Sequence, residues 1–226
     1  MSSQQREYRV DYEDLAQQVY RMLKHMILVG ELKTGEKLVQ DDLAERFGVS
    51  RTPLLSAFSK LENEMLVEFL PRRGAYVKKY ELSEIVDIYE IRVRLEPLGA
   101  AGAAENADDA SVAKLRDLCA RLTEMAEHKD PSIKEIDYEF HMTLVEMSGN
   151  RMLNNIISSF SIIPIANFYG FFKDPKLSAL EHIAITDAIA QRDARAARRA
   201  MFIHIDASRR HLLKHIESKE TDKNSA

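Results

Sequence analysis

Residues 35–79 read GEKLVQDDLAERFGVSRTPLLSAFSKLENEMLVEFLPRRGAYVKK, and this stretch decides the fold of the first part of the chain. It predicts a helix over 41–47, ended by Gly48. A second helix is expected to begin at 50–53, where a hydroxyl cap precedes a proline tolerated in the first turn. The segment 67–79 then predicts two short strands around a basic tip. The pattern is typical of a helix-turn-helix followed by a β-hairpin wing.

Apolar spacing extends this unit in both directions. Leucine, valine and isoleucine recur at helical spacing over residues 15–27, and Gly30 follows where a helix C-cap belongs. The second helix of the helix-turn-helix is expected to bury Leu54, Phe58 and Leu61. We therefore expect three helices and a hairpin packed around one small core.

The second helix of a helix-turn-helix presents its N-terminal residues to base edges in a DNA major groove. The fork of Arg51 matches guanine O6 and N7, while Ser50 and Thr52 at a helix N-terminus suit phosphate oxygens. The arginines of the hairpin tip are expected to reach a minor groove or its edge. The candidate DNA-binding residues are Ser50, Arg51, Thr52, Pro53, Ser56, Arg72, Arg73 and Gly74. The alternative is a generic small domain whose arginines are simply solvated.

Charge is unevenly divided along the 226 residues, which are enough for two domains. Residues 1–79 hold 13 Lys/Arg against 12 Asp/Glu, a net charge of +1, and residues 80–226 hold 19 against 24, a net charge of −5. A nearly neutral domain still binds DNA when its positive side chains share one side, because phosphate contacts are local. The acidic remainder is expected to stay away from the duplex.

From residue 80 onward the pattern predicts only helices, so the domain boundary is placed between 79 and 80. The fold class is mainly α, with a winged helix-turn-helix domain over 1–79 and an all-helical bundle of six to seven helices over 80–226. Pro97 and Pro164 are expected to bend or break their helices. Ser83, Asp109 and Asp193 are candidate N-caps. The expected helices cover about 83–105, 109–128, 132–149, 151–172, 177–191 and 194–217.

Four residues in this helical part have the chemistry of a metal site. Asp137 and His141 are four apart, so both lie on one helix face. His182 and His204 lie about equally far from a turn near residues 192–193, so an antiparallel helix pair would bring them to the same height. One carboxylate and three imidazoles suit a borderline divalent cation such as zinc or nickel. The alternative is that these are chance pairs and hydrogen-bonded core histidines.

The sequence also points to a compartment. There is a single cysteine, Cys119, which excludes an internal disulfide and suits a reducing cytoplasm. The polar start MSSQQREYRV does not resemble a signal peptide, and the apolar stretch near residues 160–172 is too short and interrupted to span a bilayer. A cytoplasmic protein without membrane association is expected.

The motifs LAERFGVSRTP and PRRGAYV resemble the winged-helix head of the GntR family of bacterial regulators over about 65 residues. The resemblance implies DNA binding, as a homodimer on a palindromic operator. Two departures stand out. Leu55 and Ser56 replace an arginine and a glutamate usual in that family, and Met65 replaces a glycine usual after the recognition helix.

Residues 83–217 resemble the FCD ligand-binding domain of the FadR branch of that family. The shared positions are Arg92, Leu95, Glu96, Asp137, His141, Ser148, Gly149, Asn150, Glu181, His182 and His204. The resemblance implies that Asp137 and the three histidines bind a divalent metal, with zinc favoured over nickel or manganese, and that an effector carboxylate completes the shell. Arg92 is the expected effector-binding residue, because its fork matches a carboxylate; its alternative is an ion pair with Glu96.

These features favour a DNA-binding transcription regulator, expected to be a repressor, that responds to a small organic acid. One alternative keeps the DNA binding but makes the metal itself the signal. Another is a metal-dependent enzyme acting on organic acids, since an open metal site activates water. No general base or nucleophile stands out beside the ligands, so the chain is not expected to be an enzyme.

Overall fold

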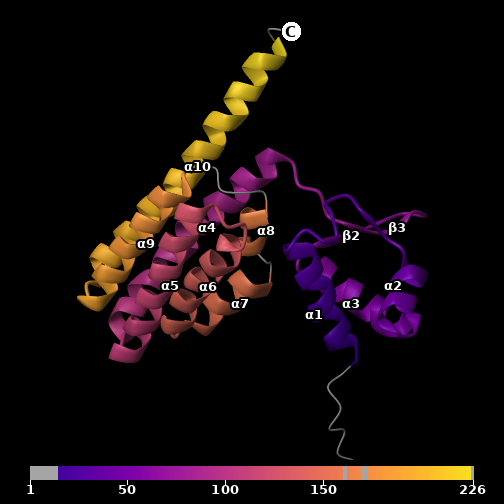
Figure 1. Cartoon of the computed structure of the whole chain (residues 1–226), viewed down its shortest axis with the longest axis horizontal. Helices are drawn as coiled ribbons and strands as arrows, with labels where there is room; N and C mark the ends of the chain where they lie inside the picture. The colour runs from indigo at the N-terminus through magenta and orange to yellow at the C-terminus, as the bar shows by residue number, and fades with distance from the viewer. Residues whose placement is uncertain (1–14, 160–161, 169–172, 225–226) are drawn as a thin grey trace, which may run out of the picture. The chain divides into compact units, whose positions relative to one another are not determined.

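The computed structural model describes residues 15–159, 162–168 and 173–224. The chain divides into two compact units, Met1–Lys79 and Tyr80–Ala226. Each unit is treated separately below, with the helix and strand labels of Figure 1.

The first unit has three helices and a small sheet. Its elements are α1 (Leu15–Leu28), β1 (Lys37–Leu38), α2 (Gln40–Phe47), α3 (Arg51–Asn63), β2 (Val67–Leu70) and β3 (Gly74–Val77). The strands are antiparallel in the order β1-β3-β2. The predicted helices and hairpin are confirmed, and β1 is the strand that the sequence pattern did not predict, because two residues are too few to show an alternation.

The core of this unit lies between α1, α3 and the sheet. As predicted, Leu54, Phe58 and Leu61 are completely buried. Val19 and Leu23 face them from α1, which packs on α3. This packing fixes α3 with its opposite face turned outward, as a DNA-reading helix requires.

Both ends of α3 differ in detail from the prediction. Ser50 occupies the N-cap position with extended backbone, but its hydroxyl makes no capping hydrogen bond, so the expected hydroxyl cap is wrong. At the other end, the amide of Leu66 donates to the carbonyl of Leu61 over 2.9 Å, and Met65 has the left-handed φ of 63°. This is a Schellman-type ending, in which the left-handed position usually belongs to glycine. Met65 therefore adopts the conformation of the glycine that it replaces.

The second unit is entirely helical in its described residues. Its helices are α4 (Leu82–Asn106), α5 (Asp109–His128), α6 (Ile133–Met147), α7 (Arg151–Ser159), α8 (Ile162–Phe168), α9 (Pro175–Ala190) and α10 (Ala194–Asn224). Helix α4 packs against α10 and α6, and α5 against α9 and α6. Figure 1 shows the long α10 running beside α9, with its C-terminal turns extending beyond the other helices of the bundle.

Prolines and caps in this unit depart from the prediction in specific ways. Helix α4 continues through Pro97, so of the expected bend or break the break is wrong. The expected helix over 151–172 appears as α7 and α8, and residues 160–161 and 169–172 lie outside the described residues. Pro164 falls in the first turn of α8, where a missing N–H costs little.

The predicted N-caps of α4 and α5 are wrong, by two positions and by one position. Glu81, not Ser83, caps α4 in a capping box with Glu84. Asp108, not Asp109, caps α5 by accepting from the amide of Ser111. The third cap is confirmed, because a side-chain oxygen of Asp193 accepts from the amide of Ala196 over 2.9 Å.

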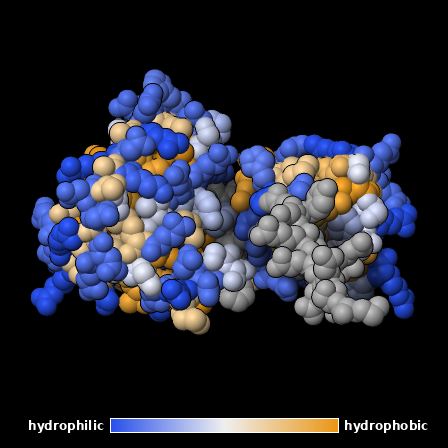
Figure 2. Space-filling view, turned by 90° about the horizontal axis from the view of Figure 1, so that it is seen from below, coloured by the Kyte–Doolittle hydropathy of each residue, from blue (hydrophilic) through white to orange (hydrophobic). Residues whose placement is uncertain are grey.

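Hydrophobic side chains are concentrated inside both units. In the second unit the completely buried ones include Ile85, Leu115, Leu118, Leu122, Phe140 and Leu144. The face in Figure 2 is mostly hydrophilic, with hydrophobic areas on both units. Among the described residues, no helix combines the length and the apolar character that crossing a membrane requires.

Candidate metal centre and nucleic-acid interface

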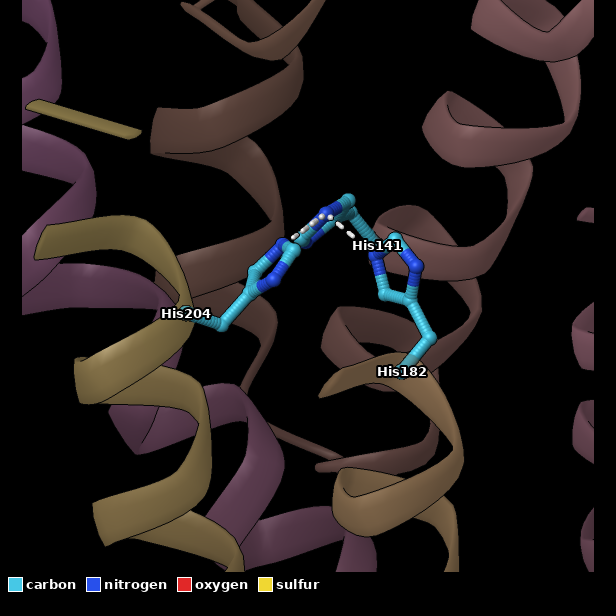
Figure 3. Close-up of side chains that lie close together, drawn as sticks. All are labelled: His141, His182 and His204. Atoms are coloured by element: carbon cyan, nitrogen blue, oxygen red, sulfur yellow. Dashed lines mark hydrogen bonds between the residues drawn. The ribbon is translucent and has the colours of Figure 1, made fainter. Parts of the chain in front are cut away.

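Three histidines from three helices meet inside the second unit. His141 comes from α6, His182 from α9 and His204 from α10, and all three are buried. The Nε2 atom of His141 lies 3.4 Å from that of His182 and 3.3 Å from that of His204. One ring nitrogen of each lies within 4.8 Å of the others. Figure 3 shows the three rings converging on one point.

Asp137 borders this histidine group. It lies one turn before His141 on α6, and its Oδ1 atom is 3.4 Å from Nε2 of His182. Its other oxygen is 3.8 Å from Nε2 of His141. The four residues that the sequence singled out therefore come together, although they lie on three different helices.

The imidazoles of His182 and His204 have the protonation state that metal ligation needs. Burial lowers the pKa of His182 and of His204 well below the ordinary 6.5, and each is lowered further by its positively charged and histidine neighbours. The ring of Phe140 lies 4.5 Å from that of His182 and forms an apolar wall. Neutral imidazoles present lone pairs, and a metal ligand must be deprotonated in this way.

Glu96 orients His141 from behind. Its Oε2 atom lies 2.5 Å from Nδ1 of His141, while its Oε1 accepts from Nε of Arg92. Burial alone would raise the pKa of Glu96, but Arg92 and His141 outweigh it and lower that pKa to about 2. This contact at Nδ1 is a close ion-pair contact without hydrogen-bond geometry, and Nε2 of His141 is directed toward the cluster, the arrangement that metal-binding histidines usually have.

Arg92 thus forms the ion pair with Glu96 that was the alternative to its effector role. Both side chains are buried, with exposures of 3% and 2%. The pairing uses Nε, and no hydrogen bond joins the two terminal nitrogens of the guanidinium to another described residue. The guanidinium also lies over the ring of Tyr89, with Cζ 5.2 Å from the ring centroid.

A second carboxylate and a buried lysine meet His204. Oε2 of Glu181 lies 2.7 Å from Nδ1 of His204. Nζ of Lys173 contacts the same carboxylate and lies 3.1 Å from Nδ1 of His204. Burial lowers the pKa of Lys173 below its ordinary value, and Glu181 opposes that shift. Nδ1 of His182, in contrast, is buried without a hydrogen-bond partner among the described residues.

Sequence reasoning did not assign Glu96, Lys173 or Glu181 to the site. Glu96 carried a usable signal, since it lies four residues after Arg92 and so shares its helix face. His182 follows Glu181 directly in sequence, but Glu181 contacts His204, which lies on a different helix, α10. Lys173 lies in the connection between α8 and α9, where there is no helical periodicity from which the burial of its side chain could be predicted.

The predicted DNA-binding residues lie along the outer face of α3 and at the hairpin tip. Ser50, Arg51, Thr52 and Ser56 are exposed, and Pro53 is half-buried. Arg51 forms an exposed ion pair with Asp41 of α2, with a terminal nitrogen 2.6 Å from Oδ1. Such a surface pair contributes only about 0–1 kcal/mol, so the guanidinium can exchange it for another anion or a base.

The tip between β2 and β3 presents Arg72, Arg73 and Gly74 to solvent. Arg72 and Gly74 both have left-handed backbone, with φ of 63° and 95°. Glycine adopts this conformation without strain, so Gly74 is what allows the turn into β3, as predicted. The two arginines stand at the end of a rigid hairpin, which suits contact with a phosphate backbone or a groove.

A helix-turn-helix with a β-hairpin wing, joined to a helical domain, defines a DNA-binding transcription regulator. Residues 15–77 match the model of the family described as bacterial regulatory proteins, gntR family, and residues 87–207 match the FCD domain. The chain belongs to the GntR family of bacterial transcription regulators and carries an FCD domain.

Relatives agree over almost the whole length. The HTH-type transcriptional regulator YdhC of Bacillus subtilis is 30% identical over 211 residues, which cover 90% of this chain and 93% of YdhC. The HTH-type transcriptional repressor RspR of Escherichia coli is 27% identical over 193 residues, which cover 84% of this chain and 85% of RspR. Among solved structures, E. coli McbR/YncC has the same fold, with a TM-score of 0.78, 22% identity, and coverage of 91% of this chain and all of McbR.

Proposed function

We propose that this regulator is a repressor whose affinity for operator DNA is controlled by a small organic acid bound beside a divalent metal in the helical unit. In this proposal residues 1–79 bind DNA, and residues 80–226 bind the effector and form the homodimer. The observation that carries the proposal is the convergence of three buried imidazoles on one point beside a carboxylate. The proposed repressor activity is supported by the similarity to RspR, whose name describes a repressor.

The donor set fits a metal ion. His141, His182 and His204 offer nitrogen atoms and Asp137 offers oxygen, which is the ligand chemistry of zinc, with nickel and manganese as alternatives. The buried Asp137 carboxylate lies 3.4 Å from Nε2 of His182 and 3.8 Å from Nε2 of His141. A divalent ion would give these ligands a common positive partner, and it would polarise an oxygen of a bound carboxylate.

The charges around the site support an anionic effector. Two cationic side chains, Arg92 and Lys173, stand beside three carboxylates, those of Glu96, Asp137 and Glu181. These five side chains together carry one net negative charge, which a divalent metal converts to one net positive charge. Burying an uncompensated charge is costly, so a monoanionic carboxylate would complete the balance. The two unused nitrogens of Arg92 match a carboxylate in number and spacing.

The coupling to DNA requires that the effector prefer one arrangement of the protein. A ligand with equal affinity for both arrangements shifts nothing, whatever its affinity. Two copies of α3 in a homodimer would read the two halves of a palindromic operator, and the spacing between them sets which operator fits. An effector that favours another spacing would release the DNA.

The metal part of the proposal is tested by elemental analysis of the purified full-length protein. About one zinc, nickel or manganese per chain is expected, and His182→Ala should lose it. His211→Ala is the matched control, because His211 is an exposed histidine on α10. Metal-free protein that takes up no ion under titration, with His182→Ala indistinguishable from wild type, would exclude the metal.

The effector part is tested by fluorescence anisotropy on duplexes selected from a randomised DNA pool, with a panel of monocarboxylates and dicarboxylates added to the metal-loaded protein. An active acid should raise the Kd for DNA, and Arg92→Lys should reduce this response because lysine lacks the bidentate fork. Equal Kd values with and without every acid, at saturating metal, would contradict the effector role.

Metal sensing is the second candidate function, and it is favoured by the position of the metal ligands on three different helices. Because they come from α6, α9 and α10, loading the ion would tie three helices together and could itself act as the signal. This candidate predicts that chelation alone abolishes operator binding, while no organic acid has an effect.

A further inference from the structure

The outer face of α3 is polar except at one position. Within α3, all of whose residues the structure describes, Leu55 is the one large apolar side chain that is exposed, with 44% of its surface accessible. Its neighbours on the same face, one turn before and one turn after, are Arg51, Thr52 and Ser59, and all three are exposed. A single exposed leucine is ordinary on a protein surface, so its place on this helix is what matters.

The side chain of Leu55 projects further from α3 than most of the side chains around it. Thr52, Ser56 and Ser59 have short side chains, whereas leucine projects an isobutyl group beyond them. The side chains that hold α3 in place, Leu54 and Phe58, are completely buried on the other side, so Leu55 is not needed to pack the helix. In a helix lying in a major groove, Leu55 would stand between the base reader Arg51 and the middle of the helix.

Only one group on the major-groove edges of the bases is apolar, and that is the 5-methyl of thymine. We propose that Leu55 is a specificity-determining residue that contacts a thymine methyl group, so that each operator half-site carries a thymine at the position facing it. Guanine and cytosine at that position present polar atoms that leucine desolvates without making a hydrogen bond. The contact depends on DNA binding through α3 and not on the proposed metal or effector.

The test uses full-length protein and duplexes selected from a randomised pool at a fixed salt concentration. Each thymine of the preferred half-site is replaced in turn by deoxyuridine, which lacks only the methyl group. At one thymine, we expect removal of the methyl to raise the Kd about fourfold, and about fifteenfold when both half-sites are changed. With Leu55→Ala, the thymine and uracil duplexes should bind equally.

Ser59→Ala is the matched control, because Ser59 is an exposed residue of the same helix outside the predicted DNA-binding set, and the variant should keep the full methyl dependence. The substitution on the DNA side involves no change to the protein, so the methyl effect is independent of any folding defect in the variants. The proposal is overturned if Leu55→Ala keeps the wild-type methyl dependence, if no thymine shows one, or if the pool yields no preferred sequence.

Discussion

Replacing Glu96 by glutamine tests the internal support of the site most directly. The Glu96 carboxylate lies between Nε of Arg92 and Nδ1 of His141, and all three side chains are buried. Glutamine has the same shape but keeps only one acceptor oxygen, and it carries no charge to pair with Arg92. Removing one member of a buried ion pair typically costs about 3–5 kcal/mol, because the other charge stays buried alone.

The pKa of Glu96 gives a second way to obtain the loss of folding free energy in this variant. A fall from the ordinary 4.5 to about 2 corresponds to about 3 kcal/mol of preference for the ionised form. Because the folded-state pKa is depressed, this contribution is complete above pH 4.5 and is lost as the pH falls toward 2. The stability difference between wild type and Glu96→Gln should therefore stay constant from about pH 5 to about pH 8.

The assay is thermal and denaturant unfolding of metal-free protein, followed by circular dichroism. For a helical unit of this size the expected loss lowers Tm by about 6–20 °C. Asp117→Asn is the control, because Asp117 and Arg121 form an exposed pair with the same spacing of four residues, 3.9 Å apart. That variant should lose about 0.5 kcal/mol or less.

Zinc titration of the same variant separates stability from orientation. Loss of a carboxylate that positions a ligand histidine should weaken zinc binding about 10- to 100-fold. If Glu96→Gln is as stable as Asp117→Asn, the view of Glu96 as the buried counter-ion of Arg92 is refuted. If it is destabilised but binds zinc like wild type, its role in orienting His141 is refuted.

Four further substitutions test other parts of the structure. Asp41→Asn removes a carboxylate next to Arg51, so selected duplexes should bind several-fold more tightly in anisotropy measurements; unchanged or weaker binding would contradict this. Gly102→Ala should lose about 1–3 kcal/mol in denaturant unfolding, because its Cβ would lie 2.8 Å from Cβ of Ser148. Gly99→Ala, whose Cβ would meet its nearest neighbour at 3.4 Å, should stay within about 1 kcal/mol of wild type, and equal losses for both glycines would speak against the close approach. Lys129→Gly should gain about 0.5–1 kcal/mol, because this exposed C-cap of α5 has a φ of 55°; a loss of stability would argue against that conformation.

Local patterns were enough for much of the fold. The helix-turn-helix, the wing and the turn between α9 and α10 were predicted because apolar spacing, glycine and capping residues act within a few positions of the chain. The errors are local as well. The N-caps moved by one or two residues to Glu81 and Asp108, since neighbouring polar residues compete for the same orphan amides. Pro97 did not break α4, although a proline inside a helix removes one backbone hydrogen bond.

For the site, the sequence by itself determined which four residues have metal-binding chemistry and that two of them share a helix face. Only the tertiary structure decided that Arg92 is paired with Glu96, that Glu96 supports His141, and that Lys173 and Glu181 meet His204. The physical reason is that side-chain chemistry and helical periodicity are properties of short segments. Which faces of α4, α6, α9 and α10 meet, and at what height, depends on how several helices fill one core together.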